Sequence, residues 1–266
     1  MEKFLTANAV FTVAELGSFL AKRGTTKTAA RDSVLRHYKE AGRIILIRRG
    51  LYAVVPIHSD PKLYQVDPYL VASKVKPDSV LAFHTALEVH GKAYSIFRRF
   101  TYFSAHRTAP FKFQSNEYVR VAPPSVHSKR SVSGIGIKTI TRSGVYVNVT
   151  SLERTLVDVL DRPDLSGSWE EIWRSLGSVE YFDVEQVIKY TRTLKNATTA
   201  AKVGFFLDQH KDQLLLDGAY ITPLRRLVPR QPHYLERANR KDCKFVPEWN
   251  LMVPNRILNK VWDEVS

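Results

Sequence analysis

The chain contains a single cysteine, Cys243, in 266 residues. One thiol cannot form an intrachain disulfide or a multi-cysteine zinc site, and this scarcity is typical of a reducing compartment. No apolar run approaches the ~20 residues needed to span a bilayer. The first residues, MEKFLTANAV, also lack the long apolar stretch of a secretory signal. These absences predict a soluble, cytoplasmic protein without a membrane partner.

The sequence has few patterns typical of catalysis. Gly134 and Gly136 precede Lys138 at the wrong spacing for a phosphate-binding loop. His84 and Glu88 are four residues apart on a predicted helix and could bind a metal. We interpret this pair as one face of a mostly buried helix instead. No Ser-His-Asp or Cys-His arrangement is identifiable from the sequence.

The sharpest catalytic candidate is Gly167-Ser168 followed by Asp183 and Glu185. Nucleotidyltransferases carry a Gly-Ser and an acidic pair that holds magnesium, with the acidic pair on strands. Here no strand is predicted before Gly167, and Asp183 opens the helical stretch DVEQVIKYTRTL. Helix capping explains these residues better than catalysis does. We therefore expect no enzyme activity, no catalytic residue, no metal and no cofactor.

Positive charge is abundant and unevenly distributed along the chain. The formal net charge is +14, with 44% apolar and 25% charged residues. Residues 1–56 hold ten Lys and Arg against four Asp and Glu, and residues 57–150 hold thirteen against five. Residues 151–220 reverse this balance, with eight against twelve. A basic first half favours a polyanion such as nucleic acid, and the acidic block after it suggests a second kind of partner.

Residues 12–55 contain two helix signatures followed by a basic hairpin. Thr12 and Glu15 have the spacing of a capping box, and apolar residues then recur on one helical face. Gly24 ends this helix, Thr25 or Thr26 can cap the next, and Gly42 ends that one. The run RIILIRRGLYAVV then alternates and turns as a two-stranded hairpin does. Helix, turn, helix and hairpin in this order predict a winged helix-turn-helix, which places its second helix in a DNA major groove.

Polar and basic residues lie off the apolar stripe of the second helix and at the tip of the hairpin. Lysine and arginine neutralise phosphates, and arginine can also bind a guanine edge with two hydrogen bonds. The alternative interpretation is an ordinary solvated surface. The ordered combination of elements favours double-stranded DNA as the partner. The predicted DNA-binding residues are Thr26, Lys27, Thr28, Arg31, Arg36, Arg48 and Arg49.

The remaining chain reads as mixed structure. The proline-punctuated stretch from Pro56 to Pro68 is a plausible domain boundary. Helices are predicted over residues 69–75 and 79–90, strands over 100–104, 111–113 and 118–121, and a hairpin over 135–149. From Thr150 onward the pattern becomes helical, with capping-box spacings that begin at Thr150, Ser168 and Asp183.

These features predict an α+β fold in three parts. Residues 1–57 form the winged helix-turn-helix, residues 64–150 a central mixed α/β segment, and residues 151–266 a helix-rich C-terminal region.

Several segments together resemble the AbiEi family, the antitoxin and repressor components of bacterial toxin–antitoxin operons. The similar segments are the winged helix with its RRGLYAV hairpin, DSVLAFHTALEVHG, NVTSLERTLVDVLDRPDLSG and the Trp-containing strand EWNLMVP. RGLYA and LERTLVDVLDRP are the most specific of these. Where the family would have a second glycine, this chain has Ser168, which can cap the following helix.

The resemblance implies that the protein represses its own operon and neutralises a co-encoded nucleotidyltransferase-like toxin through its C-terminal region. In the LERTLVDVLDRP helix, the spacing of Leu152, Leu156, Val159 and Leu160 predicts a buried stripe. The outward face that could meet the toxin would carry Glu153, Arg154, Asp158 and Asp161. Two other functions remain open. One is a ligand-sensing repressor without a toxin partner, and the other is a protein-binding module.

Overall fold

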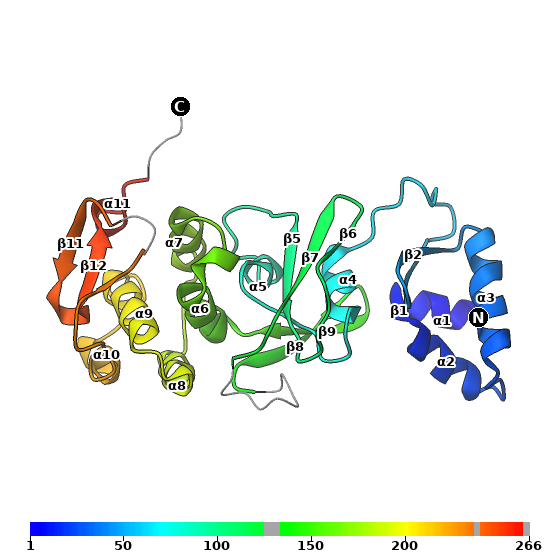
Figure 1. Cartoon of the computed structure of the whole chain (residues 1–266), viewed down its shortest axis with the longest axis horizontal. Coiled ribbons are helices and arrows are strands. Elements are labelled where there is room, and N and C mark those ends of the chain that lie inside the picture. The colour runs from blue at the N-terminus through cyan, green and yellow to red at the C-terminus, as the bar shows by residue number, and fades with distance from the viewer. Residues whose placement is uncertain (125–133, 237–239, 263–266) are drawn as a thin grey trace.

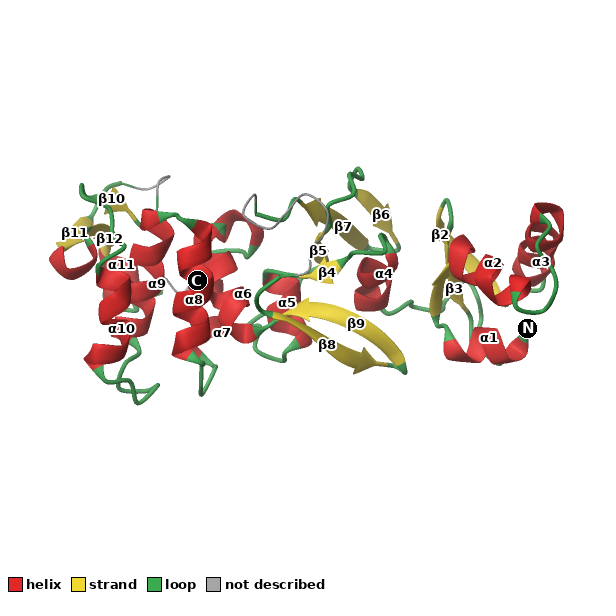
Figure 2. Ribbon diagram, turned by 90° about the horizontal axis from the view of Figure 1, so that it is seen from below, coloured by secondary structure: helices red, strands yellow, loops and turns green. Residues whose placement is uncertain are grey.

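In a computed structural model that describes residues 1–124, 134–236 and 240–262, the chain forms helices and three sheets arranged along one axis (Figure 1). The N-terminal elements lie at one end, a six-stranded sheet lies in the middle, and a helical region with a small sheet lies at the other end (Figure 2). The predicted mixture of helices and sheets is confirmed. None of the helices in the described ranges is long and apolar enough to cross a membrane.

The N-terminal unit packs three helices against a small antiparallel sheet of order β1-β3-β2. Thr12 and Glu15 form the predicted capping box, in which the Thr12 hydroxyl accepts from the Glu15 amide (3.2 Å) and the Glu15 carboxylate accepts from the Thr12 amide (2.7 Å). The elements are α1 (Glu2–Ala7), β1 (Val10–Thr12), α2 (Val13–Ala21), α3 (Thr28–Glu40), β2 (Ile44–Arg48) and β3 (Leu51–Val54).

The start of α3 differs from the sequence prediction. Lys27 occupies the N-cap position, and no side chain caps the helix. The predicted cap at Thr25 or Thr26 is therefore wrong. The Thr25 amide instead donates to the Leu20 carbonyl and completes the end of α2.

The central sheet has the order β6-β7-β5-β4-β9-β8, with parallel pairing of β5 to β7 and of β4 to β9. The predicted strands and the hairpin of residues 135–149 are confirmed.

The helix expected over residues 79–90 is wrong in its first half. Val80–Leu81 forms the strand β4, buried between β5 and β9, and the helix begins only at His84. A short apolar run that is buried on both faces has no periodicity to separate a strand from a helix. The elements are α4 (Pro68–Lys74), β4 (Val80–Leu81), α5 (His84–Val89), β5 (Arg99–Phe103), β6 (Phe111–Phe113), β7 (Asn116–Val121), β8 (Ile137–Arg142) and β9 (Val145–Thr150).

The C-terminal region is helical and carries a small sheet of order β10-β12-β11. Ser168 and Asp183 cap helices as predicted, by accepting from the amides of Glu171 and Gln186. The first cap is Ser151 and not Thr150, because Thr150 is the last residue of β9. The helices are α6 (Leu152–Asp161), α7 (Trp169–Gly177), α8 (Val184–Leu194), α9 (Ala197–Gln209), α10 (Gly218–Arg225) and α11 (Asn255–Leu258). The strands are β10 (His233–Tyr234), β11 (Cys243–Val246) and β12 (Leu251–Pro254), and short 3-10 helices cover Pro163–Leu165 and Pro247–Trp249.

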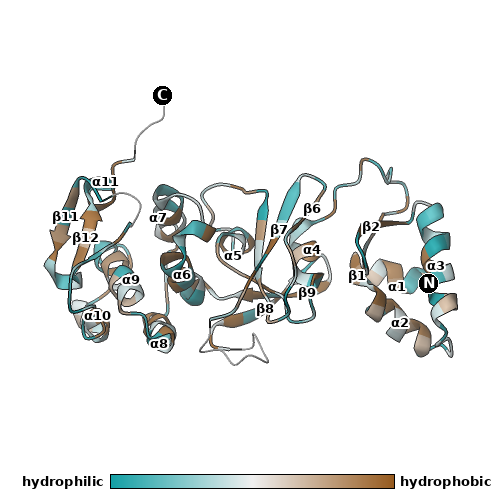
Figure 3. Cartoon of the chain, in the orientation of Figure 1, coloured by the Kyte–Doolittle hydropathy of each residue, from teal (hydrophilic) through white to brown (hydrophobic). Residues whose placement is uncertain are grey.

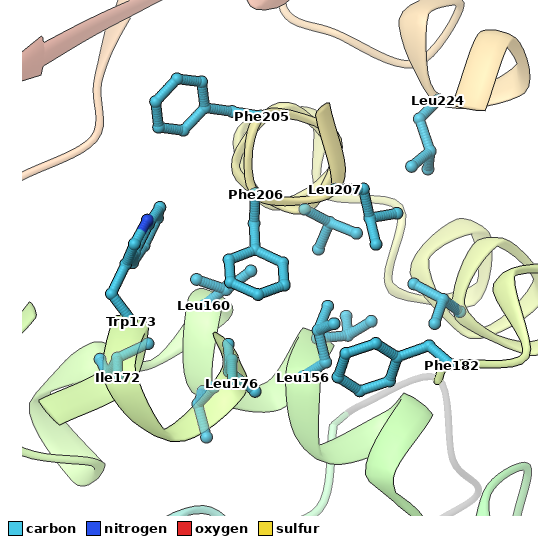
Figure 4. Packing of buried hydrophobic residues seen from close by; sticks show 14 of the residues in the cluster. Leu156, Leu160, Ile172, Trp173, Leu176, Phe182, Phe205, Phe206, Leu207 and Leu224 are labelled. Carbon is cyan, nitrogen blue, oxygen red and sulfur yellow. The ribbon is translucent and has the colours of Figure 1, made fainter. Parts of the chain in front are cut away.

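Apolar side chains form cores that cross the three predicted segments. Around α9, Phe206 packs on Trp173 of α7 with ring centroids 5.4 Å apart, above the buried leucines of α6 (Figure 4). Val80 and Phe103 of the central sheet belong to the same cluster. A second cluster joins the N-terminal sheet to the central sheet. The segments therefore share buried surface and do not form separate domains joined by flexible linkers.

Candidate nucleic-acid interface

Helix α3 lies on the outer side of the N-terminal unit, away from the central sheet (Figure 2). Leu35 is its buried residue, and Val34 and Tyr38 pack beside the same core. Because the helix packs on the core through this one narrow apolar stripe, its opposite face is exposed to solvent. Figure 3 shows hydrophilic residues along much of α3. The predicted residues Thr28 and Arg36 on the helix, and Thr26 and Lys27 just before it, are all exposed.

Arg31 differs from these residues because it already has partners. Its guanidinium pairs with Asp32 (3.0 Å), and its side chain is 29% exposed. It also lies over α2, since a Cβ built on Gly17 would be 3.9 Å from the Arg31 Cδ. A surface ion pair of this kind contributes about 0–1 kcal/mol, so an anion could displace Asp32 at little cost.

The β2–β3 hairpin packs against the central sheet. Ile47, Leu51 and Ala53 are buried in the cluster that contains Tyr102 and Tyr118 of the central strands. The face of the hairpin that carries these residues is therefore an internal contact between two parts of the chain.

Arg48 is also part of this internal contact. Its guanidinium donates to the Thr108 hydroxyl (3.2 Å) and lies 4.6 Å from the centre of the Phe111 ring. Arg48 does lie at the tip of the hairpin, as the last residue of β2, but its side chain is not free there, because a partner distant in the sequence holds its guanidinium. Arg49, in the turn beside it, is exposed.

The predicted outward face of α6 is wrong for Arg154 and Asp158, which are 0% and 2% exposed. Arg154 Nε donates to Asp158 (3.2 Å), and the Tyr190 hydroxyl donates to the other Asp158 oxygen (2.6 Å). The Arg154 guanidinium also lies about equally far from the Phe103 and Tyr190 rings, 5.0 Å from each centroid. Burial raises the pKa of Asp158 to about 6, although Arg154 and Tyr190 oppose it. Both charged residues are held between α6, α8 and the central sheet, out of reach of another protein.

The other two residues of that predicted face are half-buried. The Asp161 carboxylate accepts from the side chains of Thr199 and Asn196 at the start of α9. Glu153 lies in the first turn of α6 and remains partly open to solvent. The predicted buried stripe is confirmed for Leu156, Val159 and Leu160, all at 0% exposure.

His84 is the centre of a polar network that the sequence does not predict. Its Nε2 lies 3.0 Å from Glu171 of α7, and its Nδ1 lies 3.4 Å from Glu88, an ion-pair distance longer than an ordinary hydrogen bond. The ring also stacks on Phe97 at 3.7 Å. The only sequence signal was the four-residue spacing of His84 and Glu88, because Glu171 is 87 positions away.

Burial and hydrogen bonding compete in this network. Burial lowers the pKa of His84, but the contacts with Glu171 and Glu88 outweigh burial and raise it above 6.5. Burial raises the pKa of Glu171, but hydrogen bonds from His84, Ser95 and Ser175 outweigh it and bring that pKa to about 2. The imidazolium and the carboxylate therefore stabilise one another. No group of three or more potential metal ligands of the His, Cys, Asp and Glu types occurs within the described ranges.

A scan of protein-family models and a search of curated proteins find no match to this chain. Among solved structures, it is similar to the crystal structure of the RV2827C protein from Mycobacterium tuberculosis. The two share 17% sequence identity and superpose with a TM-score of 0.60, over 95% of this chain and 89% of that one. At this identity the similarity shows a shared fold.

Proposed function

We propose that this protein is a DNA-binding antitoxin, which represses its own operon and neutralises a co-encoded nucleotidyltransferase-like toxin. Its residues 1–57 would act as a winged helix-turn-helix, with α3 as the helix that enters the major groove. It would work in the cytoplasm without a cofactor and without catalysis of its own.

The observation that carries the DNA half of this proposal is the placement of α3. The helix is the outermost element of a basic unit, and Lys27 at its N-cap and Thr28 and Arg36 on the helix are exposed. It follows α2 after a short turn, as the second helix of a helix-turn-helix does. Side chains in the first turns of such a helix are the ones that reach base edges.

In this proposal fewer hairpin residues contact DNA than in a winged helix whose hairpin is fully exposed to solvent. Arg48 and the apolar residues beside it fix the N-terminal unit against the central sheet. Arg49 is the hairpin cation that would contact a phosphate. The basic balance of residues 1–150 would add long-range attraction to the DNA.

The DNA half is tested with a fragment from upstream of the gene's own reading frame. Binding of the full chain is measured by fluorescence anisotropy over a range of salt concentrations, beside a scrambled fragment. Arg36→Ala is expected to weaken binding by about 1–3 kcal/mol if it contacts a base, or to reduce the salt slope by about one if it contacts a phosphate. Lys211→Ala, an exposed cation in the C-terminal region, is the matched control. Equal binding of both fragments, or no effect of substitutions on α3, would contradict the proposal.

The toxin half rests on the family resemblance and on the acidic balance of residues 151–220. Of the residues first predicted to meet the toxin, Glu153 and Asp161 remain candidates, because Arg154 and Asp158 are buried. The test is co-expression of the full chain with the product of the adjacent gene. Growth rescue by the wild-type chain supports neutralisation. A neighbouring gene whose product is harmless when expressed alone would favour the alternative, a ligand-sensing repressor.

A further inference from the structure

A groove of about 610 Å³ lies between the N-terminal unit and the central sheet. One wall is formed by α1, β1 and α2, and the other by α4, the segment after it and β9. Small-molecule sites are typically clefts of about 300–1,000 Å³ and occur preferentially between structural units. The groove therefore has the size and the position of a ligand site.

The charge that lines this groove is positive. Lys74 and Lys76 line one wall, and Lys22, at the C-terminal end of α2, lines the other together with Glu15, the carboxylate in the lining. Glu15 is already satisfied, because it pairs with Lys74 across the groove and accepts from the Thr12 amide (2.7 Å). Burial raises the pKa of Glu15, but these partners outweigh burial and lower it.

The other two lysines have no such partner. Neither Lys22 nor Lys76 forms a side-chain ion pair or hydrogen bond with any residue in the part of the chain that the structure describes. Two uncompensated cations in one groove favour an anion, and phosphate is an anion that lysine commonly binds.

Aromatic side chains and neutral polar groups complete the lining. Tyr146 of β9 is 78% exposed, a large ring on an outer sheet face with little of the chain packed on it. Phe19 of α2 lines the opposite wall. The Ser73 hydroxyl donates to the Leu70 carbonyl and can still accept from a sugar hydroxyl or a base edge. Asn148 accepts from Thr139 through Oδ1, and its amide NH2 can still donate to such groups.

We propose that this groove binds a small phosphorylated molecule that carries an aromatic ring, of the size of a nucleoside monophosphate. Lys22 and Lys76 bind the phosphate, and Tyr146 packs against the ring. Such a ligand would touch both the N-terminal unit and the central sheet. The proposal does not depend on DNA or toxin binding.

The test uses the full chain with AMP, UMP, adenosine and inorganic phosphate as probes, by isothermal titration calorimetry and backbone amide chemical shifts. The two nucleotides are expected to bind with shifts at Ser73 and Asn148. Adenosine is expected to bind far more weakly, since it lacks the phosphate. Inorganic phosphate is expected to bind more weakly than the nucleotides, since it lacks the ring.

Matched variants separate the two parts of the site. Lys22→Ala with Lys76→Ala is expected to weaken nucleotide binding at least about tenfold, as the loss of charge-assisted hydrogen bonds would. The corresponding double arginine variant should retain binding and so controls for folding. Tyr146→Ala should weaken nucleotide binding but leave phosphate binding unchanged. Lys211→Ala, remote from the groove, should bind as the wild type does.

Absence of saturable binding of both nucleotides up to about 1 mM would overturn the proposal. A dissociation constant above that concentration corresponds to a binding free energy weaker than about −4 kcal/mol. Unchanged binding in the double alanine variant would also overturn the proposal. If that variant instead loses affinity for operator DNA in nucleotide-free buffer, and DNA displaces the nucleotides, the groove is a DNA contact and not a small-molecule site.

Discussion

The His84 imidazole lies 3.0 Å from the Glu171 carboxylate and so joins α5 of the central region to α7 of the C-terminal region. The same carboxylate accepts from the Ser95 amide (3.0 Å) and the Ser175 hydroxyl (3.0 Å). Glu88, on the other side of the imidazole, accepts from the Phe97 amide (2.7 Å). The two carboxylates therefore also hold the segment between α5 and β5, and the side chains of His84, Glu88 and Glu171 are buried.

This contact predicts a specific dependence of stability on pH. The pKa of His84 is raised above 6.5 in the folded chain, so its stabilisation is complete below about pH 6.5 and is lost as the pH rises through the folded pKa. The pKa of Glu171 is lowered to about 2 from 4.5, so its stabilisation is present above about pH 4.5 and is lost as the pH falls towards 2. The contact is therefore expected to stabilise the fold most between these limits. Urea unfolding measured from pH 4 to 9 checks the profile over this range.

Glu171→Gln is expected to destabilise the protein by about 3 kcal/mol, since removing one partner of a buried pair leaves the other uncompensated. It should also lower the His84 pKa and flatten the stability profile above pH 6.5, as followed by NMR of the imidazole. Glu170→Gln is the control, because Glu170 pairs with Arg174 on the helix surface and should change little. An unchanged His84 titration in Glu171→Gln would disprove the coupling.

The buried Arg154–Asp158 pair predicts a structural role for two residues that the sequence presents as a surface. Arg154→Ala is expected to cost about 3–5 kcal/mol, because Asp158 and Tyr190 would lose a buried partner. Glu153→Ala, one residue away and partly exposed, should stay within about 0.5 kcal/mol of the wild type. Thermal and urea unfolding measure both variants. Equal stability of the two would show that the pair does not hold α6 in place.

Gly204 and Gly17 predict opposite outcomes for the same substitution in two helices. A Cβ on Gly204 of α9 would lie 1.9 Å from the Trp249 ring, and Trp249 is fully buried. Gly204→Ala is therefore expected to destabilise the protein by about 3 kcal/mol or more, by overpacking. A Cβ on Gly17 of α2 meets only the Arg31 Cδ, at 3.9 Å. Gly17→Ala should stabilise by about 0.5–1 kcal/mol, through helix propensity. Urea unfolding of both variants measures these changes in stability. A Gly204→Ala variant as stable as the wild type would contradict the close approach of Gly204 to the Trp249 ring.

The neighbouring arginines of the hairpin are expected to behave differently when DNA binding is titrated with salt. Arg49→Ala should reduce the slope of log K against log salt by about one, as the loss of one phosphate contact does. Arg48→Ala should leave that slope unchanged but lower the stability of the protein, because its guanidinium contacts Thr108 and Phe111. If Arg48→Ala reduced the salt slope and left the stability of the protein unchanged, Arg48 would be a DNA-contacting residue after all.

The sequence by itself determined the features that depend on neighbours along the chain. Thr12 and Glu15 form their capping box because the two groups are three residues apart on one helical turn. The alternation of Val145, Val147 and Val149 placed one face of β9 in the core because a strand repeats every two residues. The leucine stripe of α6 was predictable for the same kind of reason.

Only the tertiary structure decided which polar residues are buried and which strands pair. Arg154 and Asp158 lie off the leucine stripe, and sequence periodicity assigns such positions to solvent. A second layer, with Tyr190 of α8 and Phe103 of β5, covers them from that side. Arg48 is similarly held by Thr108 and Phe111, which lie about sixty positions further along the chain. Contacts of this kind depend on how separate elements pack together, so the residues adjacent in the sequence do not predict them.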